Sequence, residues 1–183
     1  MEKSNQNIFT QWIAPLIAVA FIAGSAQLTI NLDWQEIKIP ISGQSFAVLV
    51  SGMLLGRKWG LVSVLLYLIL GGLGLPFFAD GGSGWESFTK GSAGFLIGFA
   101  IAAFVVGWLA DIGWRSSAAK TLLAMLIGTM IIVGAGVLWL TYLYGWRKAL
   151  EYGFYPFVWG ATVKIILGAV AVNEKVTSKF GMF

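Results

Sequence analysis

The chain has 183 residues, of which 58% are hydrophobic and 11% are charged, and its mean hydropathy is +0.82. Because a soluble domain carries about 25% charged residues, this composition excludes a largely water-exposed protein and indicates that lipid surrounds most of the chain. The sequence contains no cysteine and no histidine, which excludes disulfides, thiolate chemistry, Cys/His zinc sites and Ser-His-Asp triads.

The first apolar block, residues 9–28, is about as long as the 20 residues that cross a membrane core of about 30 Å. It is too long for the apolar core of a signal peptide, and further apolar blocks follow it. We interpret it as a transmembrane helix over roughly 9–29. Ala14 and Ala18 have the spacing of small residues at helix interfaces, either within this chain or against a partner membrane protein.

The second apolar block, residues 45–75, is interrupted by Arg57 and Lys58. Two adjacent charges are costly at the membrane centre and cost little in a turn at the interface. We therefore expect two helices, roughly 43–56 and 60–75. The first of them would rise only about 21 Å, which would leave a hollow on one side of the membrane for a neighbouring loop to fill.

Three further apolar blocks approach the length of a membrane span, and we place their helices roughly at 91–111, 121–144 and 154–173. The sequence therefore predicts an all-α membrane protein, a six-transmembrane-helix bundle in a single integral membrane domain over residues 1–183.

The basic residues of the connections indicate the orientation of the bundle. With six spans, the termini share one side of the membrane with the connections at 56–60 and 111–121. That side carries seven basic residues and the opposite side carries four, which favours cytoplasmic termini in the cell (plasma) membrane by the positive-inside rule. The seven are Lys3, Arg57, Lys58, Arg115, Lys120, Lys175 and Lys179, and the four are Lys38, Lys90, Arg147 and Lys148.

Lys164 lies near the midpoint of the last expected span, about ten residues or 15 Å from either end. A lysine side chain reaches only about 6 Å, so the ammonium does not simply extend to the headgroups. The interior of the expected spans holds no acidic residue to pair with it. Because a buried, unpaired ammonium is expensive, Lys164 is a candidate contact for an anionic ligand. The alternatives are a wet crevice or a neutral lysine with a lowered pKa.

The connection at 75–91 is longer than the roughly two to eight residues that an interhelical loop needs. It combines glycines, which permit close backbone approach to a ligand, with Phe77, Trp85 and Phe88, which can cover an apolar ring. An interfacial aromatic belt is the alternative for Trp85. Loop 31–42 lies on the same side, so both loops are candidates for a lid over the hollow at the short helix.

Residues 39–44 (IPISGQ) and 46–56 (FAVLVSGMLLG) resemble the signature of the BioY family, the biotin-binding S components of energy-coupling factor (ECF) transporters. The similarity continues through 65–68 and 71–79 and into 91–99. It covers about 40–110 densely and the last helix more loosely, and this long series of ordered motifs is a specific signal.

The resemblance implies a six-helix bundle that binds biotin near the outer face and uses no cofactor. It implies docking through the first helix, at Ala14 and Ala18, onto a transmembrane coupling subunit driven by two cytoplasmic ATPases. A shared or dedicated module and a homo-oligomer both stay open. Together with the residues above, the resemblance places substrate binding at Lys164, Asp80, Gln44, Gly82, Trp85, Phe77, Tyr67 and Trp159.

The sequence departs from the family pattern at three places. Ala161 stands where the last helix of the family carries an aspartate, three residues before the lysine. Ser42 replaces a threonine, and residues 90–95 read KGSAGF where the family usually has GPTGGY. The lost aspartate is a natural acceptor for a ureido N–H, and Asp80 is a candidate substitute. The alternative is an S-component-like carrier for another small carboxylated molecule, such as lipoate or a biotin precursor. A membrane enzyme is disfavoured because no catalytic constellation is visible.

Overall fold

A computed structural model of the chain describes residues 2–30 and 41–157. The sixth expected span, with Lys164 and Trp159, lies outside these residues except for its first positions. The described helices are α1 (Glu2–Gln27), α2 (Gln44–Gly72), α3 (Ala93–Asp111), α4 (Ala118–Tyr144) and α5 (Trp146–Gly153), with the 3-10 turns η1 (Ala79–Gly81), η2 (Trp85–Phe88) and η3 (Trp114–Ser116). The two-residue strands β1 (Thr29–Ile30) and β2 (Ile41–Ser42) pair antiparallel.

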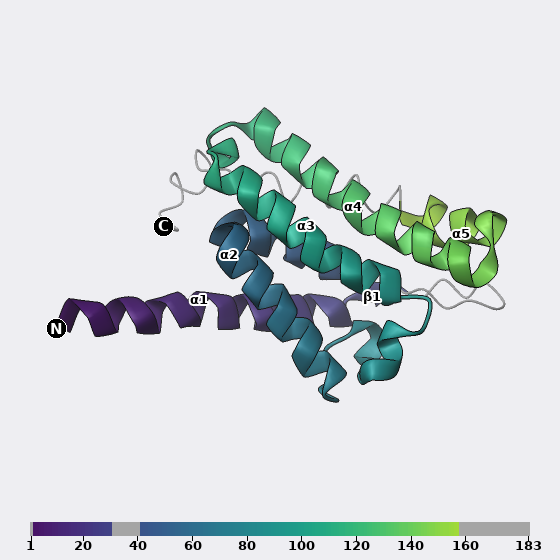
Figure 1. The fold of residues 1–183 in the computed structure, drawn as a ribbon, viewed down its shortest axis with the longest axis horizontal. Helices are drawn as coiled ribbons and strands as arrows, with labels where there is room; N and C mark the ends of the chain where they lie inside the picture. Colours follow the sequence, from purple (N-terminus) through teal and green to yellow (C-terminus); the bar gives the residue numbers. More distant parts are fainter. Residues whose placement is uncertain (1, 31–40, 158–183) are drawn as a thin grey trace.

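The described part is thus helical apart from one short strand pair, as expected for a membrane bundle. Within it, α2, α3 and α4 are long and apolar enough to cross a membrane. The apolar part of α1, Trp12–Gln27, is shorter. Figure 1 shows α3 and α4 lying side by side along the length of the molecule, with α2 beneath them and α1 projecting from one end.

Helix α2 is broken at Gly56, where the backbone adopts φ +74 and ψ 179. Its two halves pack closely against each other: a Cβ atom built on Gly60, in the second half, would lie 2.8 Å from the Cα of Gly52 in the first. The break lies at the turn that the sequence predicts between two helices, although a single non-helical residue, Gly56, forms it. The first half, 44–55, rises only about 18 Å, so it is as short as the expected second helix.

Small residues let α3 pack tightly against this break. A Cβ on Gly107 would lie 2.5 Å from the backbone nitrogen of Arg57, and one on Gly52 would lie 2.9 Å from the carbonyl oxygen of Ala103. Larger side chains at these positions would force the helices apart, so the glycines are required by the close approach. The fully buried core of the bundle includes Met53, Val64, Tyr67, Val106, Met125 and Leu140.

The connection between the fifth and sixth expected spans contains a helix that the sequence did not predict, the short helix α5. Gly145 has φ +82, which reverses the chain after α4. The helix buries Ala149 and Gly153 against the bundle and exposes Arg147 and Glu151. A search for long apolar blocks misses such a helix, because it is short and half polar.

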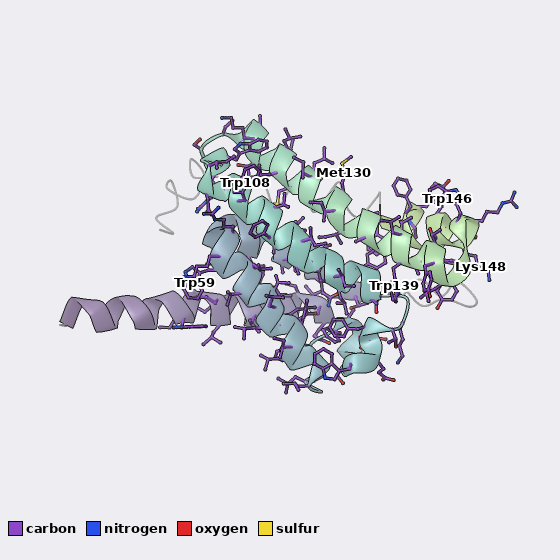
Figure 2. All side chains as sticks on the ribbon, in the orientation of Figure 1. Trp59, Trp108, Met130, Trp139, Trp146 and Lys148 are labelled. Atoms are coloured by element: carbon purple, nitrogen blue, oxygen red, sulfur yellow. The ribbon has the colours of Figure 1, made fainter. Side chains whose placement is uncertain are left out.

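Aromatic side chains mark both ends of the bundle, as expected at two membrane interfaces. Figure 2 shows Trp59 and Trp108 near one end and Trp139 and Trp146 near the other. Loop 75–92 leads into the start of α3, whereas the break at Gly56 packs against Gly107 near the end of α3, so the two lie at opposite ends of that helix.

Candidate functional site

A cavity of about 390 Å³ lies at the end of the bundle that carries loop 75–92. Its walls come from the start of α2, from the loop, from α3 and α4, and from the segment after α5. It therefore occupies the hollow expected at the end of the short helix, with the loop as its cover. The lining residues are Ser42, Gln44, Ser45, Phe78, Ala79, Asp80, Gly82, Ser83, Glu86, Ser87, Lys90, Ser92, Phe95, Leu96, Phe99, Ile132 and Phe157.

The cavity has a charged rim and an apolar floor. Asp80, Glu86 and Lys90 line it and are exposed, and the Lys90 ammonium lies 3.2 Å from the Glu86 carboxylate. Phe95 and Phe99 line the opposite side and are buried. Such a combination fits a small ligand that has both a polar group and an apolar body.

The rim of the cavity is shaped by a tight turn at Asp80. This residue has φ +59, and among the described residues it is the one non-glycine with a positive φ. Aspartate tolerates this region better than most side chains. Two backbone hydrogen bonds close the turn: the Gly82 N–H donates to the Ala79 carbonyl at 3.1 Å, and the Phe78 N–H donates to the Gly82 carbonyl at 2.9 Å.

The glycine pair at the end of α2 seats the aromatic residues of the loop. A Cβ on Gly71 would lie 2.5 Å from the ring of Phe78, and one on Gly72 would lie 3.2 Å from the ring of Trp85. The Gly84 N–H also donates to the Gly71 carbonyl at 2.8 Å. The loop is therefore packed onto α2 by its own aromatic side chains.

Two side chains on different helices hold three successive carbonyls of the loop. Gln27, at the end of α1, donates from Nε2 to the carbonyls of Pro76 at 3.2 Å and Phe78 at 3.4 Å. The hydroxyl of Tyr67 on α2 donates to the carbonyl of Phe77 at 3.0 Å. Donors from two helices thus satisfy all three carbonyls.

Gln44 connects this support to the cavity. It is 6% exposed and lines the cavity, and its Nε2 donates to the Tyr67 hydroxyl. The Ser42 hydroxyl donates to Gln44 Oε1 at 2.8 Å. The start of α2 and the covering loop are therefore joined by one chain of hydrogen bonds.

The structure brings three of the expected substrate-binding residues to the cavity wall: Gln44, Asp80 and Gly82. Tyr67 and Phe77 lie behind the wall, with their rings stacked at a centroid distance of 6.3 Å. Trp85, 58% exposed, packs outside the cavity against Gly72. Lys164 and Trp159 lie outside the described residues.

The apolar floor was not predicted from the sequence. Phe95, Phe99 and Ile132 line it, and each lies within an apolar span in which no pattern distinguishes cavity from core. The rim residue Lys90 had a weak signal, because it directly precedes the Gly91-Ser92 motif.

The two small residues of α1 that the docking prediction names differ in exposure. Ala18 is 7% exposed and packs inside the chain, and Ala14 is half-buried. The exposed face of α1 consists instead of large apolar side chains, Trp12, Ile13, Leu16, Ile17 and Phe21. The burial of Ala18 fits the internal packing role, and docking through Ala14 and Ala18 stays a prediction.

Comparisons with known proteins cover nearly the whole chain. The BioY family model matches residues 2–180. The biotin transporter BioY of Thermotoga maritima is 36% identical over 161 residues, which cover 87% of this chain and 92% of the relative. The biotin transporter BioY of Rhizobium etli is 32% identical over 167 residues, which cover 86% and 88%.

A solved structure is also similar, the crystal structure of the S-component for biotin from an ECF-type ABC transporter. It matches with a TM-score of 0.77 and 27% sequence identity, covering 92% of this chain and 91% of that chain. The sequence resemblance to an S component, and the expectation of a transport protein in place of an enzyme, are confirmed. With the family model, the relatives and the fold in agreement over almost its full length, the chain belongs to the BioY family.

Proposed function

We propose that this protein is the S component for biotin of an ECF-type transporter, which captures biotin at the outer face of the cell membrane. The observation that carries the proposal is the cavity of about 390 Å³ under loop 75–92, in a chain whose named relatives are biotin transporters. Its volume falls in the range of about 300–1,000 Å³ that is usual for small-molecule sites.

The polarity of the cavity supports a ligand of this kind. Biotin has a compact ureido head, with N–H donors and a carbonyl acceptor, and an aliphatic chain that ends in a carboxylate. Gln44 and Asp80 supply polar partners for a head group, while Phe95 and Phe99 supply an apolar surface. Burying the head group without partners would cost about 1–3 kcal/mol per unmet group.

We assign the ligand carboxylate to Lys164 and the head group to Asp80. A lysine in the interior of a span needs an anion, and the ligand provides one. Asp80 lines the cavity, and beside it no atom lies within 4 Å of a Cβ atom built on Gly81, so a ligand has room to approach the turn. Lys90 pairs with Glu86 at the rim, so its charge is already balanced there.

Equilibrium binding of labelled biotin to the purified protein tests the proposal. We expect saturable binding of labelled biotin, which unlabelled biotin displaces and lipoate does not. Lys164→Ala should weaken it, whereas the matched control Lys120→Ala, an exposed lysine of α4, should bind as wild type does. Wild-type protein that ignores biotin would refute the assignment.

A second ligand class is favoured by one observation, the alanine at position 161 where the family carries an aspartate. A carrier for lipoate, or for a biotin precursor that lacks the ureido ring, would need no acceptor for a ureido N–H. Competition by lipoate stronger than by biotin would select this class.

The proposal includes a coupling subunit and two cytoplasmic ATPases, with α1 as the docking helix. The exposed apolar face of α1 beside Ala14 supports this choice. Cytoplasmic termini are proposed from the basic residues of the connections. Cysteines introduced at Ser83 and Ser117 test the orientation, because an impermeant reagent applied outside should label the first and not the second.

A further inference from the structure

We infer that Tyr67 is a positioning residue that acts on the ligand through Gln44. This inference rests on the proposed function and concerns residues that the comparisons do not assign. Tyr67 is fully buried and is absent from the cavity wall, so it does not touch a ligand in the cavity. Its hydroxyl nevertheless lies between the covering loop and a residue that lines the cavity.

The direction of the hydrogen bonds follows from one fixed group, the backbone carbonyl of Phe77. A carbonyl only accepts, so the Tyr67 hydroxyl donates its single hydrogen there, at 3.0 Å. The oxygen of Tyr67 must then accept its second bond. The Gln44 side chain therefore turns its Nε2 toward Tyr67.

This constraint also fixes the other half of the amide. With Nε2 directed at Tyr67, Oε1 faces Ser42, whose hydroxyl donates to it at 2.8 Å. The same hydroxyl accepts from the Gln44 backbone N–H at 3.3 Å. Without Tyr67, the nitrogen and oxygen of the amide would be free to exchange places, because the two ends of a glutamine amide have nearly the same shape.

A fixed amide gives the cavity a defined polarity. A glutamine amide has two N–H donors and two acceptor positions on its oxygen. The contacts to Tyr67 and Ser42 use one of each, which leaves one donor and one acceptor on a residue that lines the cavity. This pair is complementary to a cyclic urea, which also presents a donor beside an acceptor.

The relay also couples ligand recognition to the cover of the cavity. Tyr67 holds the carbonyl of Phe77, in the segment that leads to the turn at Asp80. Displacement of that segment would break the bond to Tyr67 and release the orientation of Gln44. A closed loop and a correctly oriented amide therefore occur together.

A double-mutant cycle on biotin binding tests this role. Tyr67→Phe should weaken binding at least tenfold in the wild-type chain and less than twofold in a Gln44→Met chain, because the amide through which it acts is then gone. The matched control is Ser63→Ala, one turn away on α2, whose buried hydroxyl bonds only the local carbonyl of Trp59 in the described part of the chain. It should bind within twofold of wild type.

Two results of the binding cycle would overturn the inference: Tyr67→Phe that binds biotin as wild type does, or an equal tenfold loss in both backgrounds.

Hydrogen exchange of the ligand-free protein gives a second readout that does not depend on biotin. Tyr67→Phe, and not Ser63→Ala, should exchange the amides of 76–84 at least fivefold faster, and unchanged exchange would contradict the relay. If wild type fails to bind biotin, the proposed function fails, but hydrogen exchange of the ligand-free protein still tests whether Tyr67 holds the loop. If Tyr67→Phe does not fold, Ser42→Ala, which releases the Oε1 end of the Gln44 amide, replaces it in the binding cycle, and its loss of binding should likewise disappear in the Gln44→Met chain.

Discussion

Asp111, the last residue of α3, caps the second half of α2 through Arg57. The Asp111 Oδ2 atom accepts a hydrogen bond from the Arg57 backbone N–H at 3.3 Å and lies 3.5 Å from Arg57 Nε. Because Gly56 breaks the helix, the N–H of Arg57 has lost its intrahelical partner. A carboxylate from a neighbouring helix thus supplies the cap that the local sequence lacks.

We predict that Asp111→Ala destabilises the protein by about 0.5–2 kcal/mol, the usual range for loss of a helix cap. Asp111→Asn should lose less, because its amide oxygen still accepts the N–H bond. Both side chains of the ion pair are about half exposed, so the charge itself contributes little. Thermal unfolding in nanodiscs should give melting temperatures that decrease from wild type to Asp111→Asn to Asp111→Ala. An Asp111→Ala variant as stable as wild type would exclude the capping role.

The contact between α3 and the break in α2 gives a second prediction. Gly107→Ala should destabilise strongly, by about 1–3 kcal/mol, because its Cβ would lie 2.5 Å from the backbone nitrogen of Arg57. Gly134→Ala on α4 is the matched control, since nothing lies within 4 Å of its added Cβ. The control should be neutral or stabilising by up to about 1 kcal/mol. Equal melting of the two variants would show that the close approach is not required.

The third prediction concerns Gln27 and the loop. Gln27→Met removes the donor to Pro76 and Phe78 at nearly constant volume. We expect at least threefold faster hydrogen exchange across 75–84, with little change in the melting temperature, because Gln27 is exposed and its further bond, to the Ala23 carbonyl, lies within its own helix. Thr29→Val removes a bond at the same helix end, from Thr29 to the Ala26 carbonyl at 2.7 Å, and should leave the loop unchanged. Gln27→Lys keeps a donor and should restore part of the protection.

The fourth prediction concerns recognition of the head group by Asp80. Asp80→Asn should weaken biotin binding by about tenfold, since a charged acceptor becomes a neutral one. Ala161→Asp, which restores the aspartate of the family, should recover binding in the Asp80→Asn chain. Titration with labelled biotin compares the single and double variants. Wild-type affinity in Asp80→Asn would show that Asp80 is only a solvated loop acid.

Much of the fold follows from the sequence because hydropathy and charge act locally. The charges at Arg57 and Lys58 correctly located the break in α2, and the shortness of the preceding helix located the hollow. The capping role of Asp111 was not predicted, because it depends on a contact between residues 54 positions apart. Likewise α5 was missed, because eight residues of mixed polarity resemble a loop.

The site was predicted unevenly for a related reason. Asp80 and Gln44 stand out as polar residues at the ends of apolar segments, and both line the cavity. Tyr67 and Phe77 belong to the segments 65–68 and 71–79 of the family resemblance but lie behind the wall, and sequence alone does not distinguish contact from support. The apolar floor at Phe95 and Phe99 had no signal, because every span in a membrane protein is apolar.

Binding of labelled biotin and of biotin methyl ester to wild type and to Lys164→Ala is the most direct test of the account. We predict that wild type binds the acid, and that Lys164→Ala weakens binding of the acid at least tenfold, about 1.4 kcal/mol. The affinity for the ester should fall much less from wild type to Lys164→Ala, because the ester has no carboxylate to pair with the lysine. No binding of biotin to wild type would contradict the proposed function, and equal losses for acid and ester would contradict the role of Lys164.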